Sequence, residues 1–200
     1  LQLNHSSKKL FGVNILTLGT EIISDNIDDE ISSYNYLINQ KVNSLGSFFQ
    51  SDWSLTNKIN LLSGVRIDKH SMLDDLVVSP RYSLMYHFKK KTQFRFSYST
   101  GFRAPQAFDT DLHIAFAGGG ISRVLLSDNL NEEKSSSVSA SINYDKVAMR
   151  YLFGVTLEGF KTVLNNAFYL YPMGEDEFGE LFEKRNGSGA IVQGLTLEIR

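Results

Sequence analysis

Cysteine is absent from the 200 residues of this chain. The sequence therefore holds no disulfide framework, no Cys-ligated zinc site and no thiol nucleophile, and its composition is compatible with an oxidising compartment. Proline is also scarce, with 3 residues. No run of 18 apolar residues occurs, which excludes a sequence segment typical of a membrane-spanning helix.

Catalytic motifs are missing as well. The sequence has no Gly-x-Ser-x-Gly elbow, no His-Glu-x-x-His and no spaced carboxylate pair on one element, so we do not expect an enzyme, a resident cofactor or a metal site. The net charge of −2, from 20 basic and 22 acidic residues, shows no excess of basic residues of the kind that binds nucleic acid. The chain opens on Leu1-Gln2-Leu3 without an initiator Met or signal peptide, and we expect a fragment or a processed product.

Aromatic residues are abundant, with 14 Phe and 9 Tyr. In the stretch from Gln93 the residues Phe94, Phe96 and Tyr98 alternate with Arg and Ser, a period of two that predicts a strand with one apolar and one polar face. Gly101 and Pro105 end that strand near Arg103. A soluble sheet with one face on a core alternates in the same way, and a membrane barrel does so too.

Similar alternation recurs along the whole chain. It predicts an all-β fold, an antiparallel up-and-down meander of about eight or nine strands. On the polar side we expect Arg95, Ser137, Ser139, Arg150 and Glu198, and on the apolar side Phe94, Phe96, Tyr98, Tyr151, Phe153, Leu195 and Leu197. The strand expected at Lys8–Ile23 is irregular: Phe11, Val13 and Ile15 form its expected apolar face, with Leu16 and Leu18 on the polar side.

The connections alternate in length. Short turns are predicted at 55–58, 89–91 and 145–146, and longer connections at 24–40, 71–76, 102–131 and 162–189. Outer-membrane barrels have short periplasmic turns and longer external loops, whereas a soluble sandwich has no reason to sort its loops by end. This pattern favours a barrel. Because plugged transporters have about 22 strands, the chain would be an internal section of a larger one.

Several motifs carry a family resemblance. The segment Tyr98–Gln106 resembles the strand-to-loop segment of TonB-dependent outer-membrane receptors, and Phe108–Ile114 is similar to a subset common in Bacteroidota-type bacteria. Further segments resemble successive barrel strands of that family, in its order and spacing: Gly46–Trp53, Gly64–Asp68, Ser79–Tyr82, Arg185–Ala190 and Gln193–Glu198.

The resemblance implies that residues 1–200 are part of a receptor barrel, with the plug domain and the remaining strands absent. It implies location in the outer membrane of a Gram-negative bacterium, in contact with lipid, and uptake of a scarce solute such as a metal chelate, cobalamin or a glycan. A TonB energy-coupling complex would act through the absent plug. The alternative is a passive porin-like or structural outer-membrane barrel, which would share the same patterning.

Loops held by a rigid scaffold carry recognition, so we expect ligand contacts from Phe102–Leu130 and Thr162–Asn186. Arg103, His113 and Phe116 are the candidate binding residues. His113 with Asp109 and Asp111 offers metal ligands, but such loop residues are usually solvated. The acidic residues at 25–30 lack the glycine and spacing of an EF-hand, so a solvated loop is favoured over a Ca²⁺ site. The isolated fragment is expected to self-associate.

Overall fold

The computed structural model describes residues 2–7, 12–32, 36–89, 91–105, 116–117, 120–127, 129–148 and 151–200. Within these ranges the chain forms fourteen strands. Their bounds are β1 Gln2–Ser7, β2 Val13–Ile31, β3 Tyr36–Ser54, β4 Ile59–His70, β5 Val77–Lys89, β6 Thr92–Arg103, β7 Phe116–Ala117, β8 Gly120–Ile121, β9 Arg123–Leu126, β10 Glu133–Ala148, β11 Tyr151–Asn165, β12 Phe168–Asp176, β13 Gly179–Asn186 and β14 Ala190–Ile199. No helix in the described ranges is long and apolar enough to cross a membrane.

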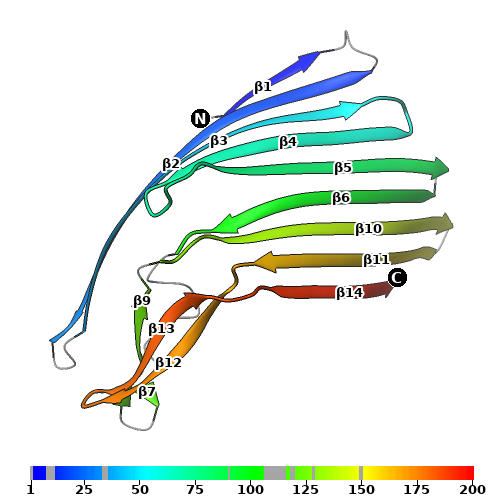
Figure 1. The fold of residues 1–200 in the computed structure, drawn as a ribbon. Coiled ribbons are helices and arrows are strands. Elements are labelled where there is room, and N and C mark those ends of the chain that lie inside the picture. Colours follow the sequence, from blue (N-terminus) through cyan, green and yellow to red (C-terminus); the bar gives the residue numbers. More distant parts are fainter. Residues whose placement is uncertain are drawn as a thin grey trace.

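Nine strands make one antiparallel sheet in the order β1-β2-β3-β4-β5-β6-β10-β11-β14. The sheet is curved and remains open, with β1 and β14 at its two edges (Figure 1). Each strand pairs with the next one of the sheet, so the predicted all-β meander of about eight or nine strands is confirmed.

The short turns lie at one end of the sheet and the longer connections at the other (Figure 1). The predicted turns at 55–58 and 89–91 are confirmed by the β3–β4 and β5–β6 connections. The turn predicted at 145–146 is wrong, because β10 continues to Ala148. Asp145 and Lys146 belong to the strand, where they pair with Gly154 and Phe153 of β11.

The acidic loop predicted at 24–40 is also wrong. β2 runs on to Ile31 and β3 begins at Tyr36, so residues 24–31 and 36–43 form a two-stranded ribbon that projects past the rest of the sheet (Figure 1). Polar pairs join the two strands: the Ser24 hydroxyl donates to Asn43 Oδ1 at 2.8 Å, and Asn39 Nδ2 donates to Asp28 Oδ1 at 2.6 Å.

The pairing registers confirm the two faces of the sheet. Facing residues in paired strands share a side, and one such row on the apolar side is Leu84, Phe96, Ala140, Gly159 and Leu195. A row on the polar side contains Ser83, Ser97 and Ser139. Phe96 and Ser139 therefore lie on opposite faces, as predicted. Arg150, expected on the polar face, lies outside the described residues.

The faces expected for the strand at Lys8–Ile23 are reversed in the structure. Leu18 pairs with Phe49, which pairs with Val65, so Leu18 shares the apolar face. Ile15 pairs with Asp52 and lies on the polar face. The first half of β2 carries aliphatic residues on both sides, so hydropathy alone did not distinguish its two faces.

No layer packs on the apolar face in the part of the chain that the structure describes. Its large side chains stay exposed, for example Phe96 at 41% and Leu195 at 82%. Tyr82 and Tyr98 stack there, with ring centroids 6.5 Å apart. The few fully buried apolar residues are elsewhere: Val42, Leu73 and Val77 lie where β3, β4 and β5 approach the longer connections. An exposed aromatic and aliphatic band is typical of the lipid-facing surface of a membrane barrel.

Candidate functional site

The two long loops predicted to bind ligand meet in a small sheet of their own. β12 and β13 form a hairpin within the predicted loop Thr162–Asn186, and β9 belongs to the predicted loop Phe102–Leu130. β13 pairs with β9 in parallel, and the strand order is β12-β13-β9. We call these three strands the small sheet. It lies beyond the end of the nine-stranded sheet that carries the longer connections (Figure 1).

A cluster of four residues, the rim cluster, joins the small sheet to the large one: Arg103, Glu133, Phe168 and Lys184. Arg103 ends β6 and Glu133 begins β10, and the two residues pair in register. Glu133 Oε2 accepts hydrogen bonds from Arg103 Nη2 at 3.4 Å and from the Phe168 backbone N–H at 3.0 Å. The Phe168 ring has Arg103 Cζ 5.1 Å and Lys184 Nζ 4.6 Å from its centroid.

Both cations lie within cation–π distance of one ring. Lys184 is only 2% exposed, and a buried ammonium is costly unless it has partners. The face of the Phe168 ring therefore supplies part of the electrostatic stabilisation that water would otherwise give the Lys184 ammonium. The rim cluster thus fixes the base of the β12–β13 hairpin by charge and aromatic contact rather than by an aliphatic core.

Asn186 adds a second attachment. Its side-chain amide Nδ2 donates to the carbonyl oxygens of Asn131 at 3.0 Å and Asn166 at 2.8 Å, and its Oδ1 accepts from the Asn131 N–H at 2.7 Å. Asn166 has φ 54, the left-handed conformation that Asn tolerates better than most residues. One amide side chain therefore satisfies backbone groups of the segment before β10 and of the β11–β12 turn.

We expect Glu133→Ala to loosen the small sheet. The change leaves the Phe168 N–H and the Arg103 guanidinium without this carboxylate, and an unsatisfied buried donor costs about 1–3 kcal/mol. Amide hydrogen exchange on the full-length protein should be at least about tenfold faster in β12 and β13. Exchange in the β6–β10 pairing should change little, and Glu133→Gln, which keeps an acceptor, should lie between. Unchanged exchange in β12 would contradict the role of the rim cluster.

The outer part of the small sheet carries two further arginine–aromatic contacts. Arg123 of β9 forms an ion pair with Asp176 and lies 5.2 Å from the Phe178 ring centroid. Arg185 of β13 pairs with Glu183 and lies 4.0 Å from the Tyr171 ring centroid. The hydrogen bond to Glu183 raises the pKa of Arg185 above its ordinary value.

The carboxylate of Glu132, just before β10, stays ionised for a similar reason. Burial raises the pKa of Glu132, but hydrogen bonds from Lys134 and from its own backbone amide, together with the charge of Lys134, outweigh burial and hold that pKa below its usual value. Lys134 Nζ lies 2.6 Å from Glu132 Oε1. The segment that enters β10 therefore carries an ion pair between Glu132 and Lys134.

The three predicted binding residues have different positions. Arg103 belongs to the rim cluster, so part of its charge already faces Glu133. Phe116 lies in β7, paired with Ile121 of β8, and its side chain is outside what the structure describes. His113, Asp109 and Asp111 lie outside the described residues. Sequence reasoning missed Glu133, Phe168 and Lys184, which no motif or spacing links.

No group of three potential metal-ligating side chains is found in the part of the chain that the structure describes. The acidic residues once considered for Ca²⁺ are on strand β2, where Asp25 and Asp28 fall on opposite faces. Both Asp28 oxygens accept hydrogen bonds from amides, of Asn26 at 3.1 Å and of Asn39. The ribbon is thus arranged as a solvated strand pair.

On the polar face of the large sheet, ion-paired side chains lie over a glycine at two places. Gly46 faces Glu21 on one side and Asp68 on the other. Arg66 Nη2 bridges these carboxylates, at 3.1 Å from Glu21 Oε2 and 2.8 Å from Asp68 Oδ1. A Cβ at Gly46 would overlap that guanidinium. The side chains therefore lie flat against the sheet because this position has no side chain.

The second pair has the same arrangement. Asp145 and Arg200 flank Gly154, and Arg200 Nη2 lies 3.4 Å from Asp145 Oδ1. A Cβ at Gly154 would lie 2.7 Å from that oxygen and 3.2 Å from Arg200 Nε. At these two positions the charged side chains therefore lie over a glycine, close to the sheet.

An open antiparallel sheet with an exposed apolar face, a polar face rich in Ser and Arg, and turns sorted by length defines a section of a transmembrane β-barrel. The comparison with protein families narrows this class. The family described as TonB dependent receptor-like, beta-barrel matches residues 1–200. The chain belongs to this family.

Solved structures agree on the fold. The siderophore receptor PirA of Pseudomonas aeruginosa is 19% identical, with a TM-score of 0.83 over 99% of this chain and 38% of that one. The hemophore receptor HasR of Serratia marcescens is 14% identical, with a TM-score of 0.72 over 99% of this chain and 38% of that one. The alcaligin outer-membrane receptor FauA of Bordetella pertussis is 18% identical, with a TM-score of 0.63 over 99% and 34%.

The chain thus spans 38% of the length of PirA. No curated protein matches the chain. At these identities the likeness establishes the fold alone.

Proposed function

We propose that the chain is a wall section of an outer-membrane receptor that takes up a scarce solute with energy from a TonB complex. The family match over residues 1–200 carries this proposal. Metal chelates are favoured over cobalamin or glycans, because the similar structures are named as receptors for siderophores, for alcaligin and for a heme-carrying hemophore. The plug domain, the remaining strands and the contact with TonB belong to the rest of the receptor.

In this proposal the apolar face contacts lipid, the polar face lines the lumen, and the small sheet stands on the outer surface of a Gram-negative cell. The short turns at the opposite end then face the periplasm. The small sheet presents Tyr169, Tyr171 and Met173 as exposed side chains. Together with Arg103, His113 and Phe116 it forms the proposed capture surface. The resemblance of residues 108–114 supports a Bacteroidota-type source.

Energy coupling separates this function from a passive porin. Cells that depend on the full receptor for an iron chelate should lose uptake when the TonB complex is deleted, and should regain it when that complex is restored. A passive channel would let the solute through in both strains. Uptake that is independent of TonB would therefore favour the porin-like alternative.

Deleting 115–123 from the full receptor should reduce uptake while the barrel still assembles. The deletion removes β7, β8 and the first residue of β9, including the Arg123–Asp176 ion pair. It leaves every strand of the nine-stranded sheet intact. Chelate affinity on whole cells measures the first effect, and resistance to unfolding in detergent measures the second. Unchanged affinity would count against a capture role for this loop.

A further inference from the structure

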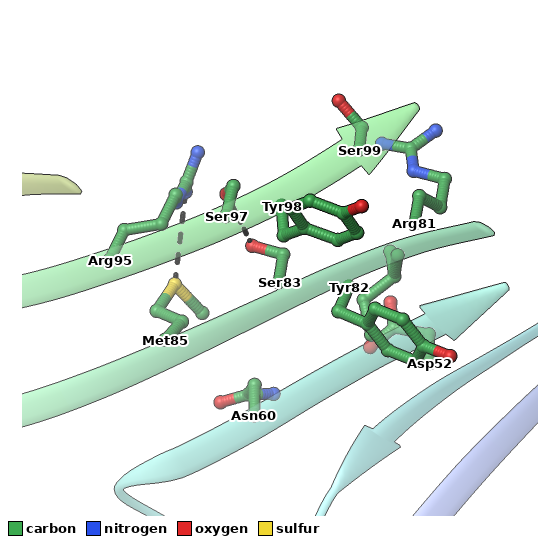
Figure 2. A pocket seen from close by; sticks show the side chains of 11 residues that line it. Asp52, Asn60, Arg81, Tyr82, Ser83, Met85, Arg95, Ser97, Tyr98 and Ser99 are labelled. Carbon is green, nitrogen blue, oxygen red and sulfur yellow. Dashed lines mark hydrogen bonds between the residues drawn. The ribbon is translucent and has the colours of Figure 1, made fainter. Parts of the chain in front are cut away.

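Two arginines flank a hollow on the polar face of β5 and β6. Arg81 faces Ser99, and Arg95 faces Met85, with the pair Ser83–Ser97 between them. Figure 2 shows Arg95 at one end of the hollow, Ser83 and Ser97 in the middle, and Arg81 with Ser99 at the other. We call Arg81, Arg95, Ser83, Ser97 and Ser99 the arginine groove. The whole hollow, which Asp52, Asn60 and Leu62 also line, has a volume of about 390 Å³, within the range of small-molecule sites.

The other polar-face arginines are neutralised. Arg66 pairs with Glu21 and Asp68, and Arg200 pairs with Asp145. Arg81 differs: among the described residues it has neither an ion pair nor a hydrogen bond. Arg95 donates one long hydrogen bond, to Met85 Sδ at 3.8 Å. The groove therefore holds two guanidinium groups without a carboxylate partner in the described part of the chain.

The floor between these arginines consists of short hydroxyl side chains. Ser83 Oγ and Ser97 Oγ lie 3.0 Å apart and share a hydrogen bond. The row continues onto β10, where Ser137 and Ser139 pair with Ser99 and Ser97. Serine hydroxyls donate to oxyanions and occupy little space. A ligand can therefore approach the floor while both guanidinium groups reach it from the sides.

Two carboxylates lie at the margins. Asp52 of β3 also lines the hollow and shares a row with Ser83, but β4 separates the two strands, so the spacing is about 10 Å. On the opposite side the neighbours on β10 are serines, and Glu158 of β11 shares the row of Arg95 through Ser141 at the same spacing. The two arginines are therefore nearer to the serine floor than either carboxylate.

We propose that the arginine groove binds carboxylate groups presented within the lumen. The guanidinium fork matches a carboxylate with two parallel hydrogen bonds. Arg81 and Arg95 have backbone positions about 14 Å apart along the strands, which suits a ligand with more than one carboxylate. The carboxylates come from a free solute or from acidic side chains of a segment that fills the lumen. This inference rests on the proposed function only in placing the polar face inside a barrel.

The test uses the full-length receptor purified in detergent. Phenylglyoxal modifies accessible arginines, and peptide mass spectrometry gives the rate at Arg81, Arg95 and, as an internal control outside the groove, Arg185. Propane-1,2,3-tricarboxylate is the probe, and its triamide is the uncharged control. The tricarboxylate should slow modification of Arg81 and Arg95 but not of Arg185, and the triamide should slow none. Arg81→Gln should weaken probe binding, measured by calorimetry, at least about tenfold, and Lys58→Gln should not.

A different result would support acidic side chains of a segment that fills the lumen as the source of the carboxylates, in place of a free solute. Arg81 and Arg95 would resist modification without probe, and the double variant Arg81→Gln/Arg95→Gln would unfold at a lower temperature than Lys58→Gln. Two results overturn the proposal: equal modification with and without tricarboxylate, or resistance to modification with no change in unfolding temperature in the double variant. No uptake is measured, so failure here is distinct from failure of the proposed transport function.

Discussion

Phe96→Arg is expected to lower the stability of the full barrel by about 2–4 kcal/mol, or to prevent its assembly. Phe96 lies in the middle of β6, in the apolar row that runs from Leu84 to Leu195. Its side chain is 41% exposed in the described chain, and in the proposed barrel that exposure is to lipid. A guanidinium at this depth loses its hydration without gaining a partner.

Ser139→Arg is the matched control. Ser139 lies beside Ala140, the residue that faces Phe96, but on the polar side of the sheet. A charge there meets water, so the same substitution should cost little. Stability is measured by reversible unfolding in detergent or lipid, together with the assembled fraction in outer membranes. Equal losses for the two variants would mean that the two faces are assigned incorrectly.

The isolated 200-residue chain is expected to self-associate in water. β1 and β14 leave two open edges with unpaired backbone groups, and such edges pair with further strands. The apolar face adds exposed side chains such as Tyr151, Leu195 and Leu197, and contiguous apolar patches beyond a few hundred Å² drive association. Closing this sheet into a smaller barrel would need a different shear and tilt from those of its registers.

Size measurement of the purified chain tests this expectation. Without detergent, light scattering should show oligomers or aggregates, formed through the edges or through the face that carries Phe96, Tyr98 and Phe153. In detergent the apolar face is covered, and association should depend on the edges alone. A monodisperse monomer in water would contradict the expectation.

Alternation was sufficient to predict the meander and the faces of β6, β10, β11 and β14. In the proposed barrel each of these strands has one face toward lipid, and such contact imposes a strict period of two. The β2–β3 ribbon escaped prediction because it extends past the apolar band. Its strands are held by backbone pairing and by polar contacts such as Asn39 with Asp28. These contacts leave no hydropathy period.

The misplaced turn has a related cause. Asp145-Lys146 has the composition of a turn, but Asp145 extends across Gly154 to Arg200. That partner is distant in sequence, so local propensity pointed to the wrong position. The rim cluster is a stronger case of the same problem. Arg103 was predicted from a loop boundary, whereas Glu133, Phe168 and Lys184 acquire their role only when β6, β10, β12 and β13 meet.

In the proposed barrel, the ion pairs over Gly46 and Gly154 affect the width of the lumen. An arginine standing upright from the wall would narrow the passage. Arg66 instead lies over Gly46 between Glu21 and Asp68, in space that a side chain at position 46 would occupy. At these two positions the wall therefore carries charge close to its backbone, and glycine is what makes room for it.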